Sequence, residues 1–258
     1  LVIVFENLTT IIQTQKIAAW KEVAQGIAHE IKNPLTPIQL NTQRLKKKYY
    51  TDREGFTKVF EESIDIISQE VEGMKDLVNE FLRFARMPAP DPKMNSLHKI
   101  IDDIYVLYSD NDKNIVIKKK YDPNINQLNI DAEQFRRVLI NLFENSLDAL
   151  NEGGLIEIST RLDSTPNKIC IEFSDNGTGI SPNNREKLFQ PHFTTKKRGT
   201  GLGLAIVNRI VVDHNGTITV RENHPKGTTF EIQLPHTPIS LNTNARSRAR
   251  FHKAPSPF

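Results

Sequence analysis

The sequence predicts an α+β protein in which a long antiparallel helical hairpin precedes a separate domain of mixed helices and strands. Apolar residues recur at spacings of three, four and seven over residues 17–45 and again over residues 60–81, and this periodicity is typical of amphipathic helices. A proline-rich segment at residues 87–92 ends the second pattern. Beyond it, runs with strand-like alternation are interspersed with helical runs, which indicates a second domain.

The composition excludes several classes of protein. Among 258 residues, 38% are hydrophobic and 25% are charged, as in ordinary globular proteins. The net charge of +3 is too small and too scattered to indicate a nucleic-acid partner. No window reaches the ~20 apolar residues of a membrane-spanning helix, so we expect no direct membrane contact. The single cysteine, Cys170, lies in an alternating strand pattern, which favours a small buried side chain over a metal ligand.

Five segments are predicted along the chain. The first residue is Leu rather than Met, so the initial residues are expected to end an upstream domain, and the last residues are polar and basic. The segments are residues 1–8, the end of that upstream domain; 9–87, the helical hairpin; 88–95, a linker; 96–236, the mixed domain; and 237–258, a disordered basic tail.

The second helix of the hairpin has an apolar seam that suits pairing with other helices. The seam residues alternate in steps of four and three; they are Phe60, Ile64, Ile67, Val71, Met74, Val78 and Phe81. One hairpin cannot bury stripes of this width alone, so we expect two chains to pair as a homodimer with a four-helix bundle. The alternative is that the hairpin packs on its own downstream domain.

The mixed domain is predicted to contain helices and strands around a loop region at residues 175–203. The expected helices are residues 97–108, 131–150, with Asp131 as the N-cap, and 203–214. The expected strands are residues 115–119, 155–161, 169–174, 217–221 and 228–234, together with a strand that ends near Ile130.

Two glycine runs in this region are candidates for phosphate binding. The run DNGTGI at residues 175–180 leaves a strand, and GTGLG at residues 199–203 opens a helix. A helix that begins in glycines offers free backbone N–H groups and a positive end to an anion. Either run alone could be an ordinary turn, and neither has the form of a Walker A loop or a Rossmann fingerprint.

A pair of asparagines adds weight to the glycine runs. Asn141 and Asn145 lie four residues apart, and so on one face of a predicted helix. Asparagine is neutral at best as a helix former, so two of them aligned require an explanation. One explanation is a polar surface, and the other is a hard cation such as Mg²⁺, held by amide oxygens and the phosphates of ATP.

His29 is the candidate nucleophile of the hairpin. It lies on the helix face away from the apolar stripe, where a histidine taken alone is usually just solvated. Glu30 could hold one ring N–H and leave the other nitrogen nucleophilic, and Asn33 shares the exposed face. Pro34 and Pro37 interrupt the helix pattern, which would suit a kink beside a nucleophile, although tertiary packing could also accommodate them.

Together these motifs resemble those of a known family. The asparagine pair, the DNGTG run, the segment FQPHF at residues 189–193 and the GTGLG run occur in the order and spacing of the N, G1, F and G2 boxes of histidine kinases. The run HEIKNPLTPIQ at residues 29–39 is similar to the phosphoacceptor box of kinases of the nitrogen-regulation type. The resemblance covers residues 17–235 and implies a dimerisation and phosphoacceptor domain, followed by an α/β sandwich of the Bergerat (GHKL) type that binds ATP.

The resemblance also implies the roles of the site residues. Asp175 would accept a hydrogen bond from the adenine amino group, Asn145 would coordinate Mg²⁺ on the ATP phosphates, and Asn141 would lie beside it. His192 departs from the family, since an aromatic residue is expected there. The implied ATP-binding residues are Asn141, Asn145, Asp175, Gly177, Gly179, Ile180, Phe193, Thr194, Thr195, Lys196, Gly199, Thr200, Gly201, Leu202, Gly203 and Leu204, of which Thr195, Lys196 and the GTGLG run would form a mobile lid.

The implied activity is transfer of the γ-phosphate of ATP to His29, with Glu30 orienting the ring and taking up its proton. The phosphoryl group would pass to an aspartate in the receiver domain of a response regulator. Asn33 would hold water for dephosphorylation of that partner, unless it is only a surface amide. The chain would be a cytoplasmic fragment of a protein anchored in the bacterial inner membrane, with residues 1–8 ending a PAS-like sensor domain.

Two other functions share the predicted nucleotide fold. ATPases of the gyrase, Hsp90 and mismatch-repair type resemble the chain in the Asn-x-x-Asp-Ala run at residues 145–149, but they activate water with a Glu where this chain has Asn141. A regulatory dimer that binds ATP only to change its shape would not need the pair His29 and Glu30. Both differences favour the kinase.

Overall fold

The computed structural model describes residues 9–51, 55–109, 114–150, 153–163, 167–191, 193–196 and 199–236, without the side chains of residues 9–25, 27–29 and 84. The elements are α1 (Thr9–Thr51), α2 (Phe56–Ala85), β1 (Lys93–Asn95), α3 (Leu97–Ser109), β2 (Ile115–Lys120), β3 (Leu128–Ile130), α4 (Ala132–Ala149), β4 (Gly154–Asp163), β5 (Lys168–Asp175), α5 (Pro182–Arg185), α6 (Gly203–Asp213), β6 (Thr217–Glu222) and β7 (Thr228–Pro235). The end of an upstream domain predicted for residues 1–8 and the basic tail predicted for residues 237–258 lie outside the described residues.

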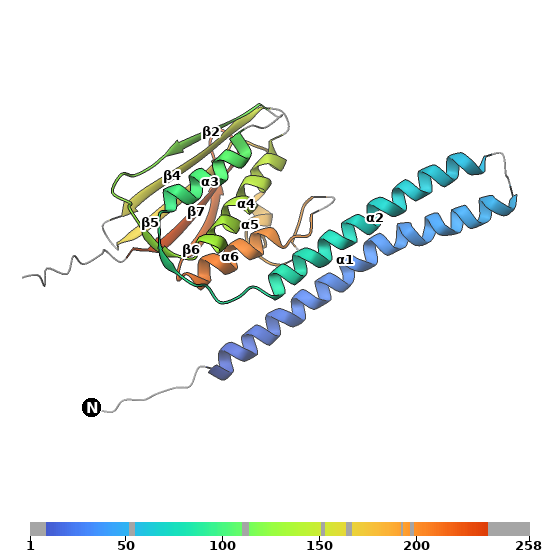
Figure 1. Cartoon of the computed structure of the whole chain (residues 1–258), viewed down its shortest axis with the longest axis horizontal. Coiled ribbons are helices and arrows are strands. Elements are labelled where there is room, and N and C mark those ends of the chain that lie inside the picture. The colour runs from blue at the N-terminus through green and yellow to red at the C-terminus, as the bar shows by residue number, and fades with distance from the viewer. Residues whose placement is uncertain are drawn as a thin grey trace, which may run out of the picture.

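Helices α1 and α2 form an antiparallel hairpin that extends from the α/β part of the molecule (Figure 1). Pro34 and Pro37 lie inside α1, which continues through both. Leu77 of α2 is buried, at 5% exposure, and an ion pair of 3.0 Å between Arg44 and Glu62 links the two helices at the surface. The hairpin and the α/β part together confirm the predicted fold class.

The α/β part contains a five-stranded mixed sheet in the order β2-β4-β5-β7-β6. Strands β2 and β4 are parallel, because helix α4 crosses over between them, and the remaining neighbours are antiparallel. Helices α3, α4 and α6 lie against one face of this sheet (Figure 1). The helices and the sheet therefore form the two layers of a sandwich.

The core lies between the helices and the sheet. Alternate residues of β5, namely Ile169, Ile171 and Phe173, are at most 2% exposed, as expected of a strand with one face toward helices. Phe143 of α4 packs edge-on against Phe173, with ring centroids 4.9 Å apart. Burial of this aromatic pair and the surrounding aliphatic residues fixes α4 over the centre of the sheet.

Polar contacts fix the beginning of α4. Asp131 caps the helix as predicted: its Oδ1 accepts hydrogen bonds from the backbone N–H groups of Glu133 and Gln134, at 3.0 and 3.1 Å. The buried ring of His214 joins α6 to this cap, since Nε2 accepts from the Asp131 N–H and Nδ1 donates to the carbonyl of Ile210. These two bonds require the neutral ring with its proton on Nδ1.

The structure differs from the sequence prediction in two short elements. Residues 93–95 were expected to belong to the linker, but they form β1, which pairs antiparallel with β3. The loop region after β5 contains the one-turn helix α5, which begins with a proline at its first position. Across the part of the chain that is described, no helix is long and apolar enough to cross a membrane.

Candidate functional site

The predicted asparagine pair lies on α4, next to the lid. The Asn141 side chain donates to the Arg137 carbonyl at 2.8 Å, so its Oδ1 remains directed away from the helix backbone. Asn145 Oδ1 accepts a hydrogen bond of 2.8 Å from Lys196 Nζ. The same ammonium group donates to Asp148 Oδ2 at 2.7 Å, and it therefore ties the lid to two residues of α4.

Asp175 is the last residue of β5 and is 2% exposed. Its Oδ1 accepts from the N–H groups of Gly177 and Thr228, at 2.9 and 3.3 Å, and its Oδ2 accepts from the Ser146 hydroxyl at 3.1 Å. Burial raises the pKa of the Asp175 carboxyl, while these three donors act in the opposite direction. The carboxyl group is thus held rigidly at the end of the sheet, close to α4.

Close backbone packing explains two of the glycines in the site. A Cβ on Gly177 would lie 2.7 Å from the Ala149 carbonyl oxygen, so only glycine allows the DNGTG run to approach the end of α4. A Cβ on Gly203 would lie 2.6 Å from Asn141 Oδ1. The first turn of α6 therefore lies directly beside the asparagine pair, with its backbone N–H groups at that end of the helix.

The lid residues are described on both sides of Lys197 and Arg198, which lie outside the described residues, as does His192. Thr194 Oγ1 accepts from the Lys196 backbone N–H at 3.1 Å. Leu202 is fully buried, and Ile180, Phe193 and Leu204 pack partly buried against the core. The lid is thus anchored by apolar residues at its ends, while Thr195 and Lys196 are exposed.

The residues predicted for chemistry at the histidine lie on α1. Glu30 is half-buried and Asn33 is exposed, whereas the side chain of His29 lies outside the described part of the structure. The structure therefore gathers the nucleotide residues predicted on α4, β5 and the glycine runs into one place. Their roles, and those of the α1 residues, stay predictions.

Four acidic or polar residues near the site were not predicted. They are Ser146, which donates a hydrogen bond to Asp175, and Asp148, which accepts one from Lys196. The other two are Glu80 of α2, which accepts a hydrogen bond from Thr200 of the lid, and Glu144, which is close to both Asp148 and Glu80. Loss of solvent and the charges of Asp148 and Glu80 raise the pKa of Glu144. Ser146 and Asp148 could have been nominated from their positions one and three residues after Asn145, whereas Glu80 has no local signal.

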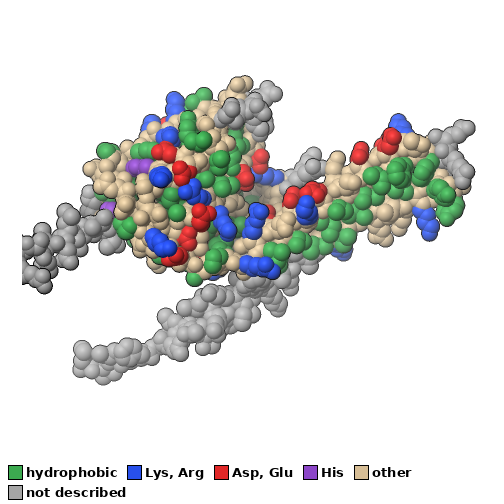
Figure 2. Space-filling model, in the orientation of Figure 1, with side chains coloured by type: hydrophobic (Ala, Val, Ile, Leu, Met, Phe, Trp, Pro, Cys, Tyr) green, Lys and Arg blue, Asp and Glu red, His purple; other side chains and the backbone are tan. Residues whose placement is uncertain are grey.

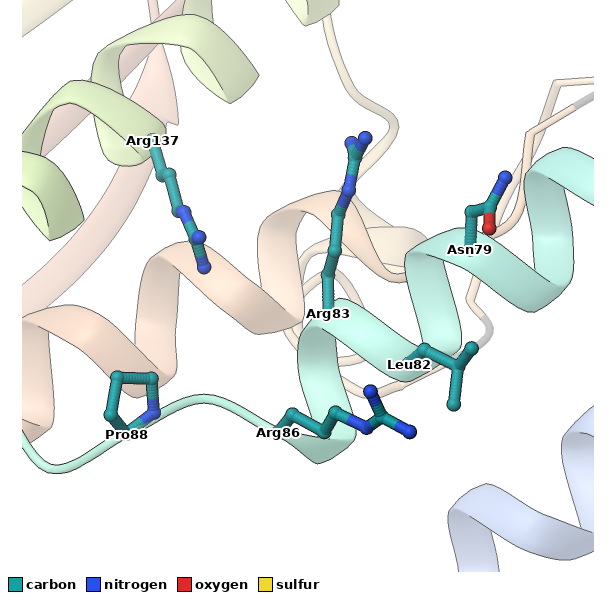
Figure 3. A pocket seen from close by; sticks show the side chains of 6 residues that line it. All are labelled: Asn79, Leu82, Arg83, Arg86, Pro88 and Arg137. Carbon is teal, nitrogen blue, oxygen red and sulfur yellow. The ribbon is translucent and has the colours of Figure 1, made fainter.

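A basic pocket borders this site without containing it. Its volume is about 430 Å³, and it lies where the end of α2, the chain that follows it and α4 meet (Figure 3). The lining residues are Asn79, Leu82, Arg83, Arg86, Pro88 and Arg137. Figure 3 shows Arg137 extending from α4 into the pocket, Arg83 extending from the last turn of α2, and Arg86 extending from the chain directly after that helix. These residues differ from those predicted to bind ATP.

Two family models match the chain in consecutive segments. Residues 19–90 match the His Kinase A (phospho-acceptor) domain, and residues 130–238 match the histidine kinase-, DNA gyrase B- and HSP90-like ATPase domain. The α/β part is therefore an ATP-binding domain, and the helical hairpin is a phosphoacceptor domain.

Similar proteins and structures share this arrangement. Nitrogen regulation protein NtrY of Azorhizobium caulinodans is 33% identical over 90% of this chain and 31% of that protein, and sporulation kinase C of Bacillus subtilis is 32% identical over 86% and 50%. The catalytic domain of histidine kinase ThkA is 33% identical, with a TM-score of 0.53 over 57% of this chain and 97% of that domain. The structure of ThkA in complex with response regulator protein TrrA covers 87% of this chain and 64% of that one, at 29% identity and a TM-score of 0.67.

A phosphoacceptor hairpin joined to a GHKL-type ATP-binding domain defines the class as the core of a two-component kinase. The chain belongs to the sensor histidine kinase family. Its likeness to NtrY and to NtrY-like kinases confirms the predicted nitrogen-regulation type. The chain spans about a third of the length of these NtrY relatives.

Proposed function

We propose that the chain transfers the γ-phosphate of ATP to its own His29 and that an aspartate of a response regulator then receives the phosphoryl group. The observation that supports this most is that Asn141, Asn145 and buried Asp175 lie along the C-terminal half of α4, where the glycine-rich start of α6 packs beside Asn141. This nucleotide site lies next to the helical hairpin that bears His29.

The residues of the site fit ATP and Mg²⁺. Glycine at positions 177 and 203 lets the DNGTG run and the first turn of α6 pack closely against α4, and Asp175 offers a carboxylate to an amino group. The Asn145 oxygen already accepts a hydrogen bond from a cationic group, the ammonium of Lys196, and a carboxamide oxygen is a hard ligand that suits Mg²⁺. When bound, Mg²⁺ would neutralise part of the phosphate charge.

The residues of α1 would carry out the proton and phosphoryl steps. One ring nitrogen of His29 attacks the γ-phosphorus in line, and the bond to the oxygen of the departing ADP breaks. Glu30 orients the ring and accepts the proton from its other nitrogen. Lys196 is free to move from Asn145 and Asp148 toward the phosphates, because it lies on the exposed part of the lid.

Hydrolysis of ATP is the second candidate function. The α/β domain belongs to a superfamily that includes DNA gyrase B and HSP90. In such ATPases a glutamate activates water at the position that Asn141 occupies, and a carboxamide cannot accept that proton at neutral pH. The match of residues 19–90 to a phosphoacceptor domain also favours the kinase over the ATPase and over a purely conformational switch.

The hairpin supports a homodimer. Phe60, Val71 and Val78, which belong to the predicted seam of α2, remain 45%, 51% and 41% exposed in the single chain. Leu35 and Leu40 of α1 are 46% and 60% exposed, and apolar side chains follow the hairpin along its length (Figure 2). Pairing of two hairpins in a four-helix bundle would cover these side chains.

The partner class follows from the family. ThkA has been solved in complex with a response regulator, and this complex resembles the chain over most of its length. We assign the same class of partner to this chain and place its reaction in the bacterial cytoplasm, where ATP is available. The anchor in the inner membrane and the phosphatase activity, which the resemblance implies, stay predictions.

Labelling with γ-labelled ATP in the presence of Mg²⁺ tests the proposed function. The wild-type chain should acquire a phosphoryl group that is stable in base and lost in acid, as expected for phosphohistidine. The label should move to an isolated receiver domain of a cognate response regulator. Release of phosphate from ATP without any labelled protein would instead identify an ATPase.

Substitution of Asp175 by asparagine tests the adenine contact. Asparagine has the same shape, and its oxygen can still accept from Gly177 and Thr228 while its NH₂ group faces the Ser146 hydroxyl, so the fold should persist. Affinity for ATP should fall about 10- to 100-fold, because two donors would face each other. Inosine triphosphate, which has a carbonyl in place of the amino group, should lose less or gain affinity. Equal changes for both nucleotides would contradict the adenine contact.

A further inference from the structure

Helix α2 contacts the ATP lid through a side chain that neither the family motifs nor the proposed reaction uses. The carboxylate of Glu80 accepts a hydrogen bond from the hydroxyl of Thr200. The same hydroxyl oxygen accepts from the Leu202 N–H at 3.4 Å, directly before α6 begins at Gly203. In Figure 1 the loop that leads into α6 reaches toward α2. Glu80 is therefore linked, through Thr200, to the helix start that is expected to receive phosphates.

The contact lies near the level of the phosphoacceptor along the hairpin. The ion pair between Arg44 and Glu62 fixes the register of α1 against α2. His29 precedes Arg44 by 15 residues, and Leu77 follows Glu62 by the same number, so the backbones of His29 and Leu77 lie at a similar height. Glu80 follows three residues later, which is about 4.5 Å further along the helix axis.

The charges around Glu80 disfavour a triphosphate in this arrangement. Glu80 and Asp148 both act on the Glu144 carboxyl, so three carboxylates lie at the edge of the nucleotide site. Lys196 offsets part of this charge, but it is bound to Asp148 at 2.7 Å and to Asn145, the proposed Mg²⁺ ligand, at 2.8 Å. An additional polyanion would be repelled by the carboxylates unless the contact opened and Lys196 turned toward it.

We propose that Glu80 is a positioning residue that holds the lid, through Thr200, in a resting position that competes with ATP. This inference rests on the proposed function, because it concerns how the hairpin controls the same nucleotide site. Binding of the triphosphate releases Thr200 from Glu80. By thermodynamic reciprocity, a hairpin conformation that withdraws Glu80 strengthens ATP binding by the same factor. A signal that moves α2 thereby changes the occupancy of the kinase site.

Replacement of Glu80 tests this role in the full chain. Glu80→Ala should bind a non-hydrolysable ATP analogue with Mg²⁺ about 5- to 20-fold more tightly, since a charge-assisted hydrogen bond that opposes binding is lost. Glu80→Gln keeps an acceptor without the charge and should show a smaller gain. The matched control is Glu61→Ala, which removes an exposed carboxylate of the same helix that is far from the lid and should leave affinity unchanged.

Two further measurements separate positioning from a general structural effect. Without nucleotide, amide hydrogen exchange of residues 199–204 should become faster in Glu80→Ala. Autophosphorylation should show a lower KM for ATP with little change at saturation, because the restraint acts before chemistry. Thr200→Val combined with Glu80→Ala should differ little from Thr200→Val alone, since either change breaks the same contact.

Some outcomes would overturn the inference without affecting the proposed function. If the wild-type chain phosphorylates His29, and Glu80→Ala has the same or weaker nucleotide affinity with unchanged lid exchange, the contact does not restrain the lid. If Glu61→Ala produces the same gain as Glu80→Ala, the effect belongs to overall charge and not to the contact. Failure of the wild-type chain to bind ATP or to label His29 would contradict the proposed function itself, and the inference with it.

Discussion

Substitution of His29 by alanine is expected to abolish autophosphorylation while ATP binding stays within about twofold of the wild type. His29 is the only histidine in the phosphoacceptor run, and the nucleotide site is built from α4, β5 and the glycine runs. The acid-labile label should therefore disappear completely. Binding of a fluorescent ATP analogue, measured on the same preparation, should show that the nucleotide site is intact.

The matched control for His29 is the exposed His224, which lies in the turn between β6 and β7. His224→Ala should label as fast as the wild-type chain. Phosphopeptide mapping under alkaline conditions should then locate the label to the peptide that contains residues 29–39. Label that survives in His29→Ala, or that resists acid, would show that another residue is the acceptor.

Most elements were predictable because their signals are local. The heptad steps in α2 and the cap at Asp131 depend on neighbours within a few residues, and the strands of the sheet alternate clearly. Strand β1 was missed because two of its three residues are polar and two are exposed, and because it pairs with β3, which lies more than 30 residues away. Short strands of this kind are decided by tertiary contacts.

The candidate site was predictable in its motifs but not in its contacts. The two asparagines and the glycine runs were nominated from spacing alone, and the structure brings them together because α4 packs on β5 and beside α6. The bond from Thr200 to Glu80 joins residues 120 positions apart. Glu80 lies on the polar side of an amphipathic helix, where glutamate is ordinary, so nothing in the local sequence distinguishes it.

Regulation of the kinase would depend on contacts that the motifs do not specify. Motifs specify chemistry that the family shares, whereas contacts between the hairpin and the lid depend on how two domains dock in one particular chain. Residues such as Glu80 can therefore set the threshold at which ATP binds without altering the phosphoryl transfer step itself. A substitution in α2 would then change signalling even though every motif residue remained in place.

Replacement of Glu30 by alanine is expected to slow autophosphorylation about 10²- to 10⁴-fold, the range for loss of a general base, with unchanged ATP affinity. Glu30→Gln should be intermediate, because an amide oxygen can still orient the ring N–H but cannot accept its proton.

Asn33→Ala serves as the matched control, since Asn33 is exposed on the same helix one turn further on. It should autophosphorylate measurably and lose most of its ability to accelerate dephosphorylation of a pre-phosphorylated response regulator, because a carboxamide can hold water in line with the aspartyl phosphate. If Glu30→Ala labels as fast as Asn33→Ala, the proton is accepted elsewhere; if Asn33→Ala dephosphorylates the regulator as well as the wild-type chain, Asn33 is a surface amide and the kinase assignment stands without it.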